Sequence, residues 1–141
     1  MKRPIYIYTL FFFSFLSLAG DDNGFLQENK ILPANEAFKI NVMNEGNEII
    51  VSWDIKEKYY LYADSIKIKQ NQNLIKHRLL IGSKNEIEDE FFGKTEIFKN
   101  ILKISVTAKS NNAEYEVLYQ GCAELGVCYP IQRYLILNSY K

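Results

Sequence analysis

Two cysteines six positions apart are the residues of this 141-residue chain best suited to covalent chemistry. Cys122 and Cys128 lie in residues 120–130, QGCAELGVCYP, between two stretches that read as strands. Gly126 can take backbone conformations closed to other residues, and two strands joined through such a loop would bring both sulfurs to one end of a hairpin. The segment therefore predicts a pair of sulfur atoms within bonding reach.

A disulfide between these cysteines could be a structural staple or a bond that exchanges with other thiols. Staples are common in small exported domains. Closing a loop of seven residues contributes only about 2.4 kcal/mol in the loop-closure model, and a chain that is 48% apolar should build a core without it. The nearby glycines, Gly121 and Gly126, would also let a partner backbone approach closely. From the residues alone, both roles stay open.

Metal and nucleic-acid chemistry fit the composition poorly. Zinc sites usually take four Cys or His ligands, whereas the chain has two cysteines and one histidine, His77. Haem attachment requires Cys-x-x-Cys-His, which is absent. Basic and acidic residues both number 17 and form no basic stripe. We therefore expect no metal, no nucleic acid and no cofactor other than the disulfide, and we expect His77 to lie at the surface.

The first residues have the pattern of a secretory signal. Lys2 and Arg3 precede a mostly apolar run over residues 5–18, which ends in small residues before the chain turns polar. The run is short for a membrane span, which needs about 20 residues. We expect residues 1–20 to be a cleaved signal peptide and residues 21–141 to form one exported domain. In such a domain, two cysteines predict one intramolecular disulfide.

Short strands must position the cysteines. Apolar and polar residues alternate over residues 38–42, as in a half-buried strand, and a turn at residues 44–47 precedes the next apolar run. The further strand candidates are rich in β-branched or aromatic residues: residues 49–53, 59–62, 66–69, 79–81, 101–108, 115–120 and 133–137. Residues 35–38 could form one helical turn, and residues 21–33 read as a loosely held lead-in. This spacing favours an all-β, immunoglobulin-like sandwich.

Several ordered motifs resemble the amino-terminal periplasmic domain of DsbD, the thiol:disulfide interchange protein family. They are LPANEAF at residues 32–38, WDIK at 53–56 followed by YYLY at 59–62, DEFFGKTEI at 89–97, and YQGC at 119–122 leading to CYP at 128–130. The match covers residues 31–137, the core of the expected domain. The cysteine spacing agrees with the family as well, which makes the resemblance specific.

The resemblance implies an immunoglobulin-like β-sandwich with the redox cysteine pair in a hairpin at one end. It implies a periplasmic protein-disulfide reductase, one module of a relay. This module would accept electrons from a thioredoxin-like donor and reduce disulfide isomerases and proteins of cytochrome c maturation. Cys128 would form mixed disulfides with these partners and Cys122 would resolve them. Since no membrane domain follows Lys141 in this sequence, we expect a separate membrane electron carrier.

The resemblance also assigns an environment to the cysteines. Its candidate residues are Tyr60, Tyr62, Asp89, Glu90, Phe91, Phe92 and Gly93. Residues 89–93 resemble the family's cap loop, in which Phe91 would cover the disulfide, Phe92 would support it and Gly93 would let the loop swing aside. Asp89 and Glu90 would raise the pKa of a nearby thiol. From the residues alone, the phenylalanines could equally be core aromatics and the tyrosines could simply pack within a strand. The two acidic residues could belong to a solvated acidic run.

Two other interpretations stay open. The chain could be a non-enzymatic secreted interaction domain with an inert disulfide, because sandwiches host many functions, or a degenerate copy that binds a redox partner without turnover. The reduction potential separates an inert bond from a reactive one, because structural disulfides lie below about −300 mV and labile ones above it.

Overall fold

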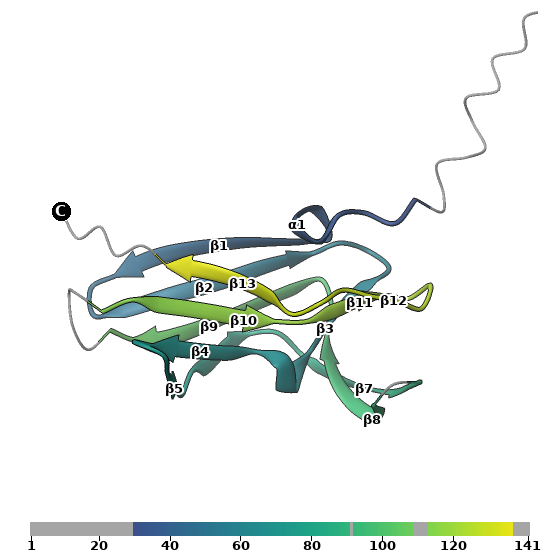
Figure 1. Ribbon diagram of the computed structural model, residues 1–141. Coiled ribbons are helices and arrows are strands. Elements are labelled where there is room, and N and C mark those ends of the chain that lie inside the picture. The colour runs from purple at the N-terminus through teal and green to yellow at the C-terminus, as the bar shows by residue number, and fades with distance from the viewer. Residues whose placement is uncertain (1–29, 91, 109–112, 137–141) are drawn as a thin grey trace, which may run out of the picture. The chain divides into compact units, whose positions relative to one another are not determined.

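The computed structural model describes residues 30–90, 92–108 and 113–136, which form three antiparallel sheets and one short α-helix (Figure 1). The first sheet has the order β1-β2-β9-β6. Its strands are β1 (Phe38–Glu45), β2 (Glu48–Ile55), β9 (Ile101–Thr107) and β6 (Arg78–Ile81). The second sheet has the order β13-β10-β4-β5. Its strands are β13 (Gln132–Ile136), β10 (Tyr115–Tyr119), β4 (Lys67–Gln70) and β5 (Asn73–Ile75).

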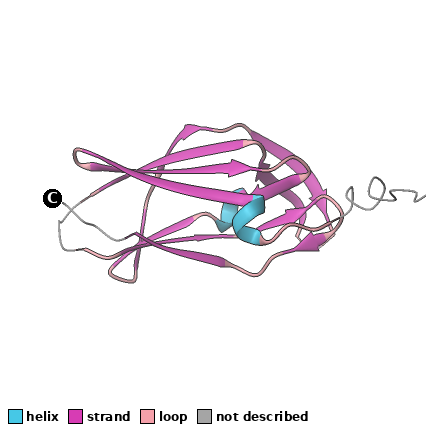
Figure 2. Ribbon diagram, turned by 90° about the horizontal axis from the view of Figure 1, so that it is seen from above, coloured by secondary structure: helices cyan, strands magenta, loops and turns pink. Residues whose placement is uncertain are grey.

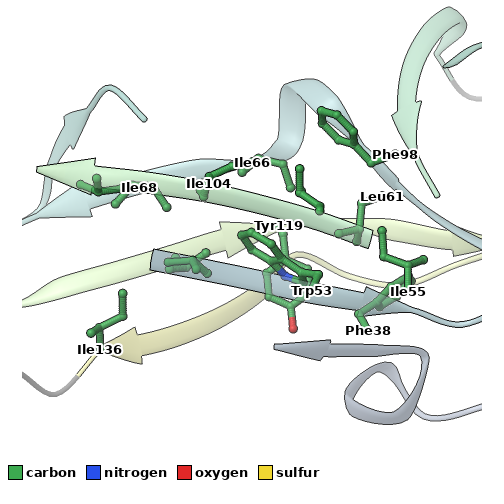
Figure 3. Close-up of a cluster of buried hydrophobic side chains, with 14 of the residues drawn as sticks. Phe38, Trp53, Ile55, Leu61, Ile66, Ile68, Phe98, Ile104, Tyr119 and Ile136 are labelled. Atoms are coloured by element: carbon green, nitrogen blue, oxygen red, sulfur yellow. The ribbon is translucent and has the colours of Figure 1, made fainter. Parts of the chain in front are cut away.

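These two sheets face each other as a sandwich (Figure 2), with the main hydrophobic core between them. Alternate residues of β2 point inward because a strand has a period of two, and Val51 and Trp53 are fully buried. The Trp53 ring meets Tyr119 of the opposite sheet edge-to-face, with 5.7 Å between ring centroids (Figure 3). The β1–β2 hairpin turns at Gly46, whose φ of 59° lies in the left-handed region that glycine tolerates.

A third sheet adjoins the sandwich and has the order β12-β11-β3-β8-β7. Its strands are β12 (Val127–Cys128), β11 (Gly121–Ala123), β3 (Tyr59–Tyr62), β8 (Gly93–Phe98) and β7 (Lys84–Asp89). β10 continues through Gln120 into β11, so one stretch of chain serves two sheets. Ser65, in the 3₁₀ turn Ala63–Ser65, holds this crossing: its hydroxyl accepts from the Gln120 N–H at 2.9 Å and donates to the Tyr62 carbonyl at 2.7 Å.

Each of the eight strands expected from the sequence is present, with some ends shifted by up to three residues, and the predicted all-β sandwich is confirmed. The expected helical turn is α1 (Ala34–Ala37). The strands not predicted are β5, β7, β8, β11 and β12, which are short or largely solvated. Solvated strands lack the alternation of apolar and polar residues that would reveal them.

The segment before α1, expected to be loosely held over residues 21–33, is attached to the core at Ile31 and Leu32. Leu32 was expected in a loosely held segment, but its N–H donates to the Tyr59 hydroxyl at 2.9 Å and its carbonyl accepts from the Tyr129 hydroxyl. Ile31 also packs against the core. The proposed signal peptide, residues 1–20, lies outside the described residues. Within the described ranges, no helix is long and apolar enough to cross a membrane.

Candidate redox site

Cys122 and Cys128 form a disulfide that links β11 to β12. The two residues are direct partners in the antiparallel ladder, with 4.0 Å between their Cα atoms. The hairpin between them turns at Gly126, whose φ is 85°. Figure 1 shows the hairpin at the opposite end of the sheets from the β1–β2 turn, so the expected placement of the cysteine pair is confirmed.

The two cysteines differ in exposure. Cys122 is fully buried, whereas Cys128 is partly exposed. The difference follows from position in the sheet, because β11 is flanked by β3 and β12 while β12 is the outer strand. Of the two cysteines, Cys128 is therefore the one with surface open to solvent.

β3 supplies the tyrosines beneath the disulfide. Its four residues are all buried, but they serve two surfaces: Tyr59 and Leu61 face the sandwich core, whereas Tyr60 and Tyr62 form a separate cluster with Cys122. The Tyr62 hydroxyl oxygen lies 3.1 Å from Cys122 Sγ and 3.7 Å from Cys128 Sγ. The structure thus places both tyrosines, which the sequence analysis named as site candidates, beside Cys122.

Asp89, at the end of β7, joins the tyrosines to the neighbouring loop. Its Oδ2 accepts hydrogen bonds from the Tyr62 hydroxyl at 2.6 Å and the Tyr60 hydroxyl at 3.0 Å. Its Oδ1 accepts from the backbone N–H of Phe92 at 3.1 Å. The carboxyl is buried together with the hydroxyls, and such groups are stable inside a protein only when their hydrogen bonds are satisfied.

The tyrosine hydroxyls stay protonated at neutral pH. Burial raises the pKa of Tyr62 above its usual value near 10, and its hydrogen bond to Asp89 raises it further. Burial also raises the pKa of Tyr60. The Tyr62 O–H can therefore hydrogen-bond to sulfur throughout the range in which thiol exchange is studied.

The loop between β7 and β8 places the Phe92 ring against this cluster. Phe92 packs edge-to-face on Tyr62, with 5.0 Å between ring centroids, while 60% of its surface stays exposed. Gly93 follows with a φ of 66°, a conformation that favours glycine. Phe91, the residue expected to cover the disulfide, lies outside the described residues, and Glu90 is exposed. The cap-loop roles of these residues stay predictions.

A groove of about 350 Å³ opens beside Cys128. We call it the Cys128 groove, and its described lining residues are Tyr60, Ile87, Glu88, Asp89, Glu90, Ile97, Lys99, Glu124, Gly126 and Cys128. Lys99 and Glu124 form an ion pair across it. Sequence reasoning missed these two residues, because an isolated lysine and glutamate in turns carry no signal that they meet.

The described residues contain no group of three or more Cys, His, Asp or Glu side chains arranged to hold a metal ion. His77 lies between β5 and β6 and is exposed, which confirms its expected surface position. The chemistry that this site supports is that of the two sulfur atoms and the hydroxyl beside them.

Comparisons with known proteins agree on the family. The family model described as "Thiol:disulfide interchange protein DsbD, N-terminal" matches residues 28–139. DsbD of Yersinia enterocolitica is 38% identical over 119 residues, which are 81% of this chain and 20% of the relative. DsbD of Photorhabdus laumondii is 32% identical over 140 residues, 96% of this chain and 24% of the relative. The chain thus spans about a fifth to a quarter of these relatives.

Two solved structures share the fold. The reduced DsbD amino-terminal domain of Neisseria meningitidis has a TM-score of 0.66 and 29% identity, covering 75% of this chain and 87% of that one. The same domain in complex with the PilB amino-terminal domain has a TM-score of 0.63 and 28% identity, covering 80% and 94%. With the family model matching most of its length, this chain belongs to the DsbD amino-terminal domain family.

Proposed function

We propose that this domain carries electrons between proteins by thiol–disulfide exchange at Cys122 and Cys128. The observation that carries the proposal is the asymmetry of the bond: Cys128 is partly exposed beside a groove, and Cys122 is buried against the Tyr62 hydroxyl. Membership of the DsbD family supports the same chemistry. An inert staple would need neither the accessible sulfur nor the hydroxyl.

The loading half of the reaction follows from this geometry. A donor thiolate attacks Cys128 Sγ, a mixed disulfide forms, and the Cys122 sulfur leaves as a thiolate. The Tyr62 hydroxyl, 3.1 Å from that sulfur, can turn its single hydrogen from Asp89 Oδ2 to the new charge. The donor's second thiolate then attacks the donor's first sulfur, which is bonded to Cys128 in the mixed disulfide. This step releases Cys128. Two electrons and two protons have moved to the domain, and the donor is left as a disulfide.

The unloading half runs the same steps with another protein. Cys128 attacks the acceptor's disulfide, and Cys122 then attacks Cys128, which restores the bond and releases a reduced acceptor. We propose a thioredoxin-like donor, and as acceptors periplasmic disulfide isomerases and proteins of cytochrome c maturation. The family resemblance supports these partners, and export directed by residues 1–20 would place the domain in the periplasm.

The loop at residues 89–93 is proposed to shield the bond between encounters. Two contacts support this proposal. The Phe92 ring packs against Tyr62, and the Phe92 N–H donates to the Asp89 carboxyl, so the loop lies against the tyrosine cluster. The left-handed backbone at Gly93 provides a point where it could turn aside.

Trapping tests the roles of the two cysteines. Cys122→Ser should accumulate a mixed disulfide with an oxidised thioredoxin-like protein, because Cys128 can attack and nothing resolves the product. Cys128→Ser should capture nothing. Both variants lack the disulfide, so they serve as matched controls for stability, which circular dichroism checks. Capture that survives Cys128→Ser would refute the assignment.

The reduction potential distinguishes this proposal from an interaction domain with an inert bond. Equilibration with a dithiol buffer should give a potential above about −300 mV, the region of labile disulfides. A value well below it would favour the structural staple.

A further inference from the structure

The Cys128 groove carries an electrostatic bias. Among its described lining residues, carboxylates outnumber amines four to one. The amine, Lys99, is engaged with Glu124. Glu88 and Glu90 are exposed at the groove, while Asp89 is buried within the tyrosine cluster. The exposed sulfur therefore lies in surroundings of predominantly negative charge.

Two further lysines of the third sheet pair with carboxylates outside the groove. Lys94 lies opposite Glu88 in the β7–β8 ladder, but its ammonium is 3.8 Å from Glu86 and its side chain is 78% exposed. Lys84, further along β7, pairs with Glu96. Within the described part of the third sheet, these lysines are thus engaged with carboxylates outside the groove.

This bias matters because the attacking group in thiol exchange is an anion. A thiolate approaching Cys128 moves toward Glu88 and Glu90, and negative charge persists over the sulfurs through the displacement. Like charges within about 10 Å repel measurably at low ionic strength. A positive group on the molecule that carries the thiolate offsets this repulsion, whereas a second negative group adds to it.

We propose that the Cys128 groove selects thiols by charge: it admits a partner whose redox cysteine is surrounded by cationic side chains, and it disfavours small anionic thiols. The inference rests on the proposed exchange at Cys128 and names the chemistry of the face that must dock there. Complementary charge of this kind raises association rates and suppresses wrong partners. It acts together with steric cover by the loop, which cannot distinguish thiols of similar size.

Three small thiols of similar size test the proposal on the oxidised full chain. Cysteamine carries a cation, 2-mercaptoethanol is neutral and 2-mercaptoethanesulfonate carries an anion. Reduction rates are expressed per thiolate and divided by the rates of the same thiols with hydroxyethyl disulfide, which removes differences in intrinsic nucleophilicity. We expect cysteamine to exceed 2-mercaptoethanesulfonate by about tenfold at low salt, and by about twofold at 1 M salt.

The variant Glu88→Gln/Glu90→Gln assigns the effect to the groove. It should reduce the low-salt ratio severalfold, whereas Glu45→Gln in the exposed β1–β2 turn should leave the ratio unchanged. Equal normalised rates for the three thiols, or a ratio that the double variant does not change, would overturn charge selection and leave the proposed function standing. A disulfide that neither these thiols nor a reduced thioredoxin-like protein reduces would overturn both.

Discussion

Removing the Tyr62 hydroxyl should make the domain a stronger reductant. In the disulfide form this hydroxyl donates to Asp89 at 2.6 Å, and the Cys122 sulfur, 3.1 Å away, has no hydrogen to donate. In the reduced form the Cys122 thiol can donate its hydrogen to the tyrosine oxygen while the tyrosine hydroxyl still donates to Asp89. The hydroxyl therefore stabilises the reduced form more than the oxidised form. Tyr62→Phe should lower the reduction potential.

The size of the shift follows from one hydrogen bond. A typical net contribution is about 0.5–1.5 kcal/mol, and about 1.4 kcal/mol corresponds to about 30 mV for this two-electron couple. We expect the potential of Tyr62→Phe to fall by about 10–30 mV. The oxidised protein should also lose about 1.5–3 kcal/mol of unfolding free energy, because a buried hydrogen bond to a carboxyl group is lost.

Tyr60→Phe is the matched control for this measurement. Tyr60 lies on the same strand and donates to the same Asp89 oxygen, but the hydrogen bonds to sulfur come from Tyr62. It should lose comparable stability with a smaller change in potential. Equilibration of both variants with a dithiol buffer, beside denaturant unfolding, gives the two quantities. A potential that rises in Tyr62→Phe, or that falls equally in both variants, would refute the reasoning.

Three further outcomes are expected. Gly121→Ala should lower the unfolding free energy, measured with denaturant, by about 3 kcal/mol, because a Cβ there would lie 2.3 Å from the Tyr60 carbonyl oxygen. Gly126→Ala has open space around it and should lower it by about 1 kcal/mol, because of its left-handed φ. Equal losses in the two variants would contradict the close approach at Gly121. Phe92→Ala should speed reduction by neutral 2-mercaptoethanol with little loss of stability, since the ring is largely exposed; an unchanged rate would argue against a shielding ring. Above pH 10 stability should fall, because the raised pKa values of Tyr60 and Tyr62 mean that the unfolded chain ionises first; an unfolding free energy that falls as steeply with pH in Tyr60→Phe/Tyr62→Phe would contradict this.

The sandwich strands could be predicted from the sequence because each carries its own signal. β1 alternates, β2 is an apolar run ending in Trp53, and the strand candidates on either side of the cysteines implied a hairpin. β7 carries no such signal: residues 84–89 are mostly exposed, with Ile87 only half-buried. An edge strand of this kind is specified by the strand it pairs with, and its own residues reveal little.

The arrangement around the sulfurs depended on long-range pairing. Asp89 stands in a run with Glu86, Glu88 and Glu90, and nothing local marks it as the buried carboxyl. Its burial follows from the β7–β8 register and the tyrosines of β3. The apolar run YYLY does not itself distinguish the two tyrosines near the disulfide, because all four of its residues are buried; only the family resemblance singled out Tyr60 and Tyr62.

The hydrogen bonds at Leu32 set a practical limit on how far the chain can be shortened. Its carbonyl accepts from the hydroxyl of Tyr129, the residue directly after Cys128, and its N–H donates to Tyr59. Burial raises the pKa of Tyr129 to about 12, so this hydroxyl remains a donor in any ordinary buffer. An expression fragment that starts at Pro33 would leave both tyrosine hydroxyls without these partners, next to the reactive sulfur. Fragments intended for electron-transfer assays should therefore retain Ile31 and Leu32.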